Sequence, residues 1–254
     1  MKTHLTLIYL ALVAGCAGLV SCSSSGTSAS SPAADISSGI GSSAIYKEYN
    51  AAGNSVLNKG WPYKLDASGI ALDDKHTCTL ITRRHVVMAK HYKRGVGKQV
   101  VFHNRQGQRV ARKITAIKGG SGDYAVGLLD EPVPAGIRVY PLPTPTPDLK
   151  TRLIDVPVIV TDQHRRLYVH RIKRFQSYLV FFKYSNHIRK KILVSGDSGN
   201  PSFLMVRGQP VLVETHYGGG PGIGPFYGDA RVQMELKFLI SELDPNYSFK
   251  TVSY

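Results

Sequence analysis

Residues 195–201, SGDSGNP, carry the clearest chemical signal in the sequence. Here Ser198 stands next to glycine on a tight turn, where its hydroxyl can point outward as a nucleophile. In such a turn the backbone N–H groups of Gly196 and Ser198 can converge on one point and stabilise an oxyanion. Asp-Ser-Gly is also common in ordinary loops, so this segment by itself does not establish catalysis.

Two further segments could supply a base and an acid. His91 follows an apolar stretch within residues 82–91, TRRHVVMAKH, and an unperturbed imidazole titrates near neutral pH. Asp123 opens residues 123–129, DYAVGLL, and could orient a histidine and stabilise its imidazolium. Each residue also has a structural interpretation, because a single His is often packed or exposed and an Asp often ends a turn.

In the order His, Asp, Ser, these segments resemble the chymotrypsin-like serine peptidases over roughly residues 60–245. TRRHVVMAKH is similar to the family's strand ending in Ala-Ala-His, DYAVGLL to its Asp-x-Ala-Leu strand, and GDSGNP to its Gly-Asp-Ser-Gly-x-Pro signature. The resemblance implies His91 as base, Asp123 as orienting acid and Ser198 as nucleophile. It also implies an oxyanion hole at Gly196 and Ser198, and no cofactor. His85 is then expected to be a strand residue.

The sequence departs from this family at two places near the expected site. Tyr92 follows His91 where many members carry a cysteine, in agreement with a chain that lacks that disulfide. In activated animal members the Asp before the serine pairs with a new chain N-terminus. Asp197 therefore needs another partner or a further cleavage, and the sequence leaves both alternatives open.

Residues 214–219, ETHYGG, lie where the family builds one wall of its primary pocket. The string resembles the His-Trp-Gly-Gly of bacterial glutamyl endopeptidases, whose pocket histidine contacts an acidic side chain. The resemblance assigns Leu193, Thr215, His216 and Gly218 to the substrate pocket, and it makes a preference for Glu at P1 one expectation. Alternatively, His216 is a packed strand residue. Leu193 stands where those enzymes carry a Thr, and nothing nearby suggests an acidic pocket floor for Lys or Arg.

Short apolar segments separated by turns must position these residues. The ranges with strand character are 78–88, 99–103, 110–117, 123–129, 152–161, 166–174, 177–183, 192–194, 202–206 and 210–215. Leu236, Leu239, Ile240 and Leu243 recur at helical spacing and predict one short C-terminal helix. The pattern favours two β-barrels or sandwiches. The resemblance implies an all-β fold of two antiparallel six-stranded barrels with the active site between them.

The first residues predict export. A positive start is followed by 16 apolar residues, 5–20, too few to span a bilayer but typical of a signal peptide. The run ends in Leu-Val-Ser-Cys, which resembles a bacterial lipobox with Cys22 as the lipidated residue. Cys16 is a second candidate, and an ordinary secretory signal is the alternative. Ten of the 22 residues from 23 to 44 are Ser, as expected of a tether.

Five regions follow from these patterns. They are the signal peptide 1–21, a Ser-rich tether and lead-in 22–58, an N-terminal β-barrel 59–140, a Pro-rich linker 141–148, and a C-terminal β-barrel with the helix at 149–254. The expected location is the cell envelope, with the protein exported and lipid-anchored, in the outer membrane or periplasm if the cell is Gram-negative. The expected partners are a peptide or protein substrate and the membrane, through Cys22.

The chain has 254 residues and a formal net charge of +15, from 32 Lys and Arg against 17 Asp and Glu. Residues 75–122 hold 12 basic and no acidic residues, and residues 163–196 hold nine and none. An exported chain rarely meets nucleic acid, so anionic envelope polymers or acidic substrates are the expected partners, and a solvated basic face without a partner is the alternative. His164, His170 and His187 lack close acidic or Cys partners, so no metal site is expected.

Two functions from different classes fit the sequence. The first is a serine endopeptidase of the cell envelope that works through an acyl-enzyme. The second is a catalytically silent relative that keeps the barrels and binds anionic polymers or envelope components through its basic surface.

Overall fold

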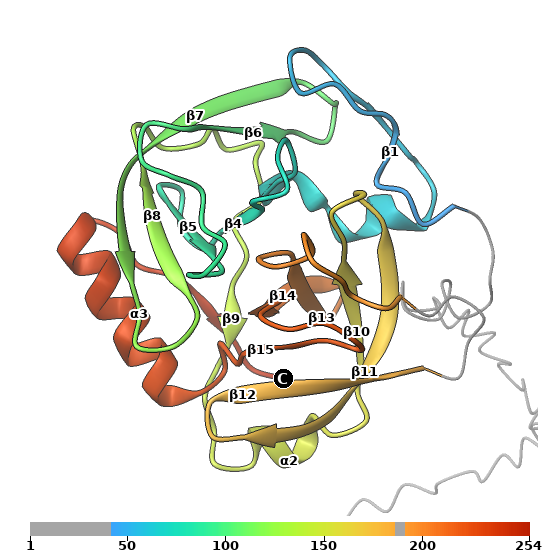
Figure 1. Ribbon diagram of the computed structural model, residues 1–254, viewed down its shortest axis with the longest axis vertical. Coiled ribbons are helices and arrows are strands. Elements are labelled where there is room, and N and C mark those ends of the chain that lie inside the picture. Colours follow the sequence, from blue (N-terminus) through green and yellow to red (C-terminus); the bar gives the residue numbers. More distant parts are fainter. Residues whose placement is uncertain (1–41, 186–190) are drawn as a thin grey trace, which may run out of the picture.

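Two six-stranded antiparallel sheets, each curled into a barrel, form most of the structure (Figure 1). The structure is a computed structural model and describes residues 42–185 and 191–254. The strand orders are β3-β4-β5-β8-β7-β6 in the N-terminal barrel and β14-β13-β10-β11-β12-β15 in the C-terminal barrel. The predicted fold class, an all-β chain of two six-stranded barrels with a short C-terminal helix, is confirmed.

The N-terminal barrel contains the predicted strands of this region, one of them divided in two, and a short strand at Ile70–Ala71 that the sequence pattern did not indicate. Its strands are β3 (Ile70–Ala71), β4 (Cys78–Leu80), β5 (His85–Met88), β6 (Gln99–His103), β7 (Arg109–Gly119) and β8 (Ala125–Leu129). The single strand predicted over 78–88 is two strands. The chain turns between them because the Thr82 hydroxyl accepts the N–H groups of Arg84 at 3.1 Å and His85 at 2.9 Å.

The C-terminal barrel shows three further differences, one of which is a strand at Ile223–Pro225 that the sequence pattern did not indicate. Its strands are β10 (Pro157–Thr161), β11 (Leu167–Gln176), β12 (Leu179–Tyr184), β13 (Pro201–Val206), β14 (Gln209–Thr215) and β15 (Ile223–Pro225). The strand predicted from 152 begins only at Pro157, because a helical turn, α2 (Leu149–Arg152), and Asp155 at a φ of 65° precede it. The strand predicted at 192–194 is reduced to one bridge between Leu193 and Gly220.

Buried side chains form three apolar clusters. One fills the N-terminal barrel and includes Cys78, which is a fully buried free thiol, and another fills the C-terminal barrel. The third lies between the barrels and contains Tyr124, Tyr140, Phe203 and Tyr227. The relative position of the two barrels, and so of any site between them, therefore depends on close packing of large side chains.

The C-terminal helix crosses back to the first barrel. Helix α3 (Ala230–Leu243) begins at Asp229, whose carboxylate accepts the N–H of Arg231, and it buries Leu236, Leu239 and Ile240 as its spacing predicts. It packs against β7 and β8 of the N-terminal barrel (Figure 1). Within the described residues no helix is both long and apolar enough to cross a bilayer.

The remaining elements join the barrels at their edges. A two-stranded ladder of β1 (Tyr46–Glu48) and β2 (Val56–Leu57) is followed by 3-10 turns at Trp61–Leu65 and Ala67–Gly69. Strand β9 (Leu142–Pro143), in the predicted Pro-rich linker, pairs in parallel with β16 (Thr251–Val252) near the C-terminus. The predicted signal peptide, Cys16, Cys22, the first residues of the tether and His187 lie outside the described residues.

Candidate active site

His91, Asp123 and Ser198 meet at the boundary between the two barrels. His91 Nδ1 lies 2.5 Å from Asp123 Oδ2, and the backbone N–H of His91 donates to Asp123 Oδ1 at 2.8 Å. On the other side of the ring, His91 Nε2 lies 2.9 Å from Ser198 Oγ. The carboxylate therefore fixes the imidazole in one tautomer, with Nε2 free to accept the serine proton.

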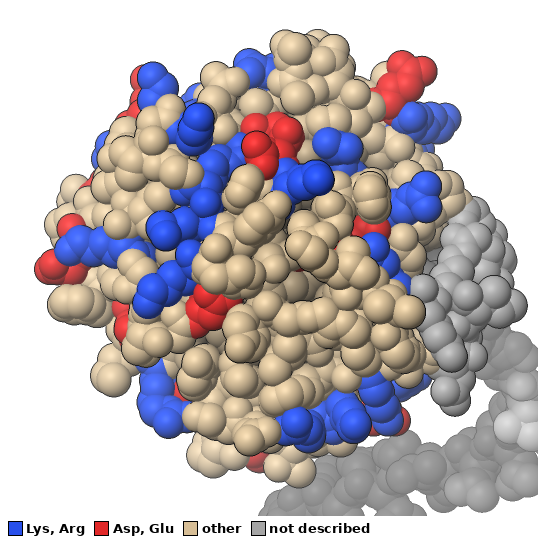
Figure 2. All heavy atoms as spheres, in the orientation of Figure 1, with Lys and Arg blue, Asp and Glu red and all other residues tan. Residues whose placement is uncertain are grey.

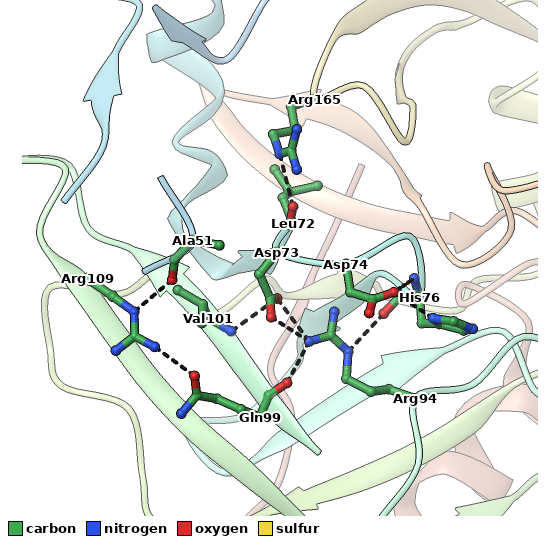
Figure 3. A network of polar contacts seen from close by, with 10 residues as sticks. All are labelled: Ala51, Leu72, Asp73, Asp74, His76, Arg94, Gln99, Val101, Arg109 and Arg165. Carbon is green, nitrogen blue, oxygen red and sulfur yellow. Dashed lines mark hydrogen bonds and ion pairs between the residues drawn. The ribbon is translucent and has the colours of Figure 1, made fainter. Parts of the chain in front are cut away.

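The loop that carries His91 follows the buried strand β5 and is held by a buried ion pair (Figure 3). Arg94 is 4% exposed, and its Nη1 donates to both carboxylate oxygens of Asp73, at 2.8 and 2.9 Å, and to the carbonyl of Gln99 at 2.7 Å. Its Nε donates to the carbonyl of His76 at 3.2 Å. Since Arg94 lies three residues after His91, these bonds fix the end of the loop.

A stacked aromatic pair supports the same loop. The ring of Tyr92 lies 4.2 Å from that of His76 at an angle of 25°, and His76 Nδ1 lies 2.6 Å from Asp74. Tyr92 stands where many members of the resembled family carry a cysteine. Packing and charge thus hold this loop where a disulfide is absent.

The loop that carries Asp123 is bound by helix α3. The Glu235 carboxylate accepts the N–H of Ser121 at 2.7 Å, the Ser121 hydroxyl at 2.8 Å, and the hydroxyl of Tyr124. Asp123 itself lies in a bend two residues before β8, so the strand begins slightly later than predicted. A C-terminal element therefore positions an acid on the N-terminal barrel.

The turn that carries Ser198 needs glycine at two positions. Gly196 has a φ of 95° and Gly199 a φ of 82°, a region that other residues rarely adopt. A Cβ on Gly199 would lie 2.9 Å from the carbonyl oxygen of Thr77, so glycine also allows the turn to approach the N-terminal barrel. This close approach brings Ser198 within reach of His91.

The predicted oxyanion donors face no competitor in the described part of the chain. Neither the N–H of Gly196 nor that of Ser198 has an acceptor among residues 42–185 and 191–254. Three other N–H groups of this turn are used: that of Asp197 by Val194, that of Gly199 by His216 and that of Asn200 by Asp197. Free donors at Gly196 and Ser198, close in the chain to the Ser198 hydroxyl, are able to bind a developing negative charge on oxygen.

A cavity of about 230 Å³ opens beside Ser198. Three of the four predicted pocket residues line it, namely Leu193, His216 and Gly218. Thr215 does not, because it is fully buried and its hydroxyl lies 2.7 Å from the hydroxyl of Tyr227, behind the wall. Val194 and Tyr217, which are 51% and 46% exposed, add apolar surface at the rim.

His216 forms the base of this cavity as part of a buried ion pair. Its Nδ1 lies 2.9 Å from Glu214 Oε1, its Nε2 lies 3.1 Å from the carbonyl oxygen of Thr161, and its side chain is 1% exposed. Burial lowers the pKa of His216, but the Glu214 carboxylate and the Thr161 carbonyl together outweigh burial and raise the pKa above its usual value. Both ring nitrogens are thus directed into the protein.

The other buried histidines have structural surroundings. His85 lies in β5, as expected, with Nδ1 2.9 Å from the Thr82 hydroxyl, and burial lowers its pKa to about 4. Burial also lowers the pKa of His170 to about 4, and its Nδ1 lies 2.6 Å from the carbonyl of Pro221. In the described part of the chain, no three His, Cys, Asp or Glu side chains are grouped so that they could hold a metal ion.

Basic side chains on one face of the molecule lie apart from one another and do not form a single patch (Figure 2). On the face shown in Figure 2, Lys and Arg lie in several groups over both barrels, around a central area with little charge. Several of them hold backbone carbonyls: Arg84 donates to Leu129 and Asp130, and Arg112 donates to Pro132. Part of the positive charge is therefore structural.

Sequence reasoning did not identify Asp73, Arg94 and Glu235 as supports of the site. No local pattern marks them, because Asp73 and Arg94 pair across 21 positions and Glu235 binds Ser121 across 114. A scan against models of protein families found no match to this chain, and a search of curated proteins found none either.

Proposed function

We propose that this protein is a serine endopeptidase in which Ser198, His91 and Asp123 act as nucleophile, base and orienting acid. The proposal rests on one observation, the placement of the His91 ring 2.9 Å from Ser198 Oγ and 2.5 Å from Asp123 Oδ2. Geometry of this kind supports acyl transfer whatever the fold that carries it.

The reaction would proceed in two halves. Ser198 Oγ attacks the peptide carbonyl while its proton passes to His91 Nε2, and the N–H groups of Gly196 and Ser198 stabilise the oxyanion. His91 then gives the proton to the amine, which departs. The acyl part of the substrate stays bound to Ser198 as an ester. Water, deprotonated by His91, attacks that ester and releases the acid, and the proton returns to Ser198.

The cavity favours an uncharged P1 side chain. Leu193 and Val194 line one side, and the nitrogens of His216 face Glu214 and the Thr161 carbonyl rather than the cavity. The preference for Glu at P1 stays a prediction, and the surroundings of His216 weaken it because its Nδ1 lies beside the Glu214 carboxylate and its Nε2 beside the Thr161 carbonyl. Export and lipid attachment at Cys22 also stay predictions from the sequence alone.

Loss of the Ser198 hydroxyl tests the proposal. We expect the wild-type protein to hydrolyse casein and to react with a fluorophosphonate, and Ser198→Ala to lose both by at least a factor of about 1,000. Ser241→Ala, which changes an exposed serine on α3, is the matched control and should retain full activity.

A wild-type protein that folds but does not react with the fluorophosphonate would contradict the proposal. Salt-sensitive binding of that unreactive protein to an anionic polymer would then favour the catalytically silent relative. With an active enzyme, peptide nitroanilides ending in Leu, Glu or Lys would measure the P1 preference, and Leu should be hydrolysed fastest.

A further inference from the structure

Asp197, the residue before the proposed nucleophile, is a buried carboxylate. Its side chain is 1% exposed, Oδ1 accepts the N–H of Gln163 at 3.0 Å, and Oδ2 accepts the N–H of Val194 at 2.8 Å. These neutral donors leave the negative charge itself unpaired, and an unpaired buried charge is strongly unfavourable. The turn of residues 195–199 therefore requires a cation beneath it.

Lys191 provides that cation within the described residues. Its Nζ lies 3.4 Å from Asp197 Oδ2 and 3.3 Å from Asp162 Oδ2, and its side chain is 14% exposed. Asp162 is as deeply buried as Asp197. One ammonium thus joins two carboxylates, one below the turn that carries Ser198 and one at the turn between β10 and β11.

No amino terminus of the chain lies beside Asp197 in the part that the structure describes. Residues 43–45 run antiparallel to the β10–β11 turn, where Ile45 N–H donates to the carbonyl of Arg165 and Leu167 N–H donates to that of Ser43, both at 2.9 Å. Ile45 is 2% exposed, and its nitrogen is an ordinary peptide nitrogen. The positive charge comes from a side chain rather than from a chain end.

We propose that the ammonium group of Lys191 holds residues 195–199 in the oxyanion-binding conformation, so that the protein is active without a cleavage that brings a new amino terminus to Asp197. The inference rests on the proposed peptidase function and adds how that site is kept competent. Lys191 is a positioning residue, since it acts on the reaction only through Asp197 and the adjacent N–H groups.

The β10–β11 turn gives Lys191 a rigid base. Asp162 Oδ1 accepts the N–H groups of His164 at 3.0 Å and Arg166 at 2.9 Å, which closes the turn. Gln163 then reaches across, and its Nε2 donates to the carbonyl of Ser195 at 3.0 Å. Backbone and amide groups of this hairpin, together with the ammonium group of Lys191, therefore hold the turn that presents Gly196 and Ser198.

The same two carboxylates keep Lys191 charged. Burial lowers the pKa of Lys191, but Asp197 and Asp162 outweigh burial and raise its pKa above the usual value for lysine. The ammonium is consequently present throughout the neutral and mildly alkaline range.

Substitution of Lys191 tests the inference in the full chain, with casein and a fluorophosphonate as probes. We expect Lys191→Met to lower kcat about 100-fold with KM changed less than about threefold, because displaced oxyanion donors affect the transition state most. Lys191→Arg keeps the charge and should recover at least about a tenth of the activity. The matched control is Lys183→Met, which removes an ammonium 2.8 Å from the exposed Asp155 and should be fully active.

A folded Lys191→Met protein with wild-type kcat would overturn the inference. Mass spectrometry of the fluorophosphonate-labelled wild-type chain gives a second measurement that does not depend on how the variant folds. The labelled species should retain residues that precede Ser43. Labelling confined to chains newly cleaved within residues 42–60 would overturn the inference, because a new amino group would then be needed. A wild-type chain that is never labelled, cleaved or intact, would refute the peptidase function itself and the inference with it.

Discussion

His91 combines an exposed ring with two fixed partners. Its side chain is 45% exposed, whereas that of Asp123 is 19% exposed, so the acid is shielded and the base remains open to water. Because Asp123 is shielded from solvent, its contact with the His91 ring is strengthened. Because the ring is exposed, the water that reacts in the second half of the proposed reaction can reach it. Asp123 thus orients the ring, and His91 transfers the proton.

His85, six residues earlier, has the opposite surroundings and should affect stability rather than catalysis. Its folded-state pKa of about 4 lies below the unfolded value of 6.5, so protonation favours the unfolded chain. The stability it contributes is complete above pH 6.5 and is lost as the pH falls toward 4. We expect the free energy of unfolding to fall by about 2 kcal/mol per such histidine between pH 6.5 and 5.

Urea denaturation of His85→Asn at pH 5 to 7.5 checks this. Asn keeps a polar atom toward Thr82, and the fall in the free energy of unfolding from pH 7.5 to 5 should be smaller than in the wild type by about 2 kcal/mol, the contribution of one such histidine. His164→Asn, at an exposed position, is the control and should follow the wild type. An unchanged slope for His85→Asn would show that His85 is charged or exposed in the folded protein.

At the scale of elements, each residue of the proposed triad lies on a loop that a charged side chain from elsewhere holds. Arg94 with Asp73 fixes the loop of His91, Glu235 on α3 fixes that of Asp123, and Lys191 with Asp162 fixes that of Ser198. Strands supply the anchor points, but the loops between them set the distances between reacting atoms.

Arg94→Met should destabilise the protein and slow the proposed reaction. It leaves Asp73 buried without its cation, which costs about 3 kcal/mol in comparable buried pairs, and it frees the end of the His91 loop. Chemical denaturation and kcat measured on the same variant check both effects. Lys118→Met, which breaks an exposed pair with Glu242, should change stability by less than about 0.5 kcal/mol. A fall of less than about 1 kcal/mol in the free energy of unfolding of Arg94→Met would mean that water already solvates the Asp73 carboxylate.

The whole molecule carries a formal charge of +15, and the Lys and Arg residues on the face shown in Figure 2 lie in several groups. Such a charge attracts anionic groups from a distance and is screened beyond about 10 Å at 0.1 M salt. Some of the basic side chains also donate hydrogen bonds to backbone carbonyls. The same residues therefore contribute both to the positive potential of the surface and to the stability of the fold.

Salt should therefore change the preference of the proposed enzyme for acidic peptides. At about 10 mM salt, kcat/KM for a peptide flanked by Glu should exceed that for its Lys-flanked counterpart severalfold, and the ratio should approach one near 0.5 M. Stopped assays with two peptides that share one scissile sequence, one flanked by Glu and the other by Lys, measure this ratio. A ratio that does not depend on salt would show that the basic surface has no part in substrate capture.

The sequence alone predicted most strands of the two barrels, the C-terminal helix and the three residues of the proposed triad, but not β3 or β15. These features are local: the apolar run at 100–102, helical spacing at 236–243 and glycines around Ser198 are visible within a few positions. The failures are at turns, such as the bend that separates β4 from β5. There a single hydroxyl, that of Thr82, decides where the strand ends.

Only the tertiary structure decided which charged residues support the site and where the side chains of the pocket wall point. In the sequence the 32 Lys and Arg residues are nearly equivalent, yet Lys191 pairs with Asp162, 29 positions away, and Glu235 binds Ser121 across 114. Thr215 and His216 are adjacent, yet one packs behind the wall and the other forms the base. Such choices follow from burial and distance in space, because a charge is stabilised by whatever lies near it after folding and not by its neighbours in the chain.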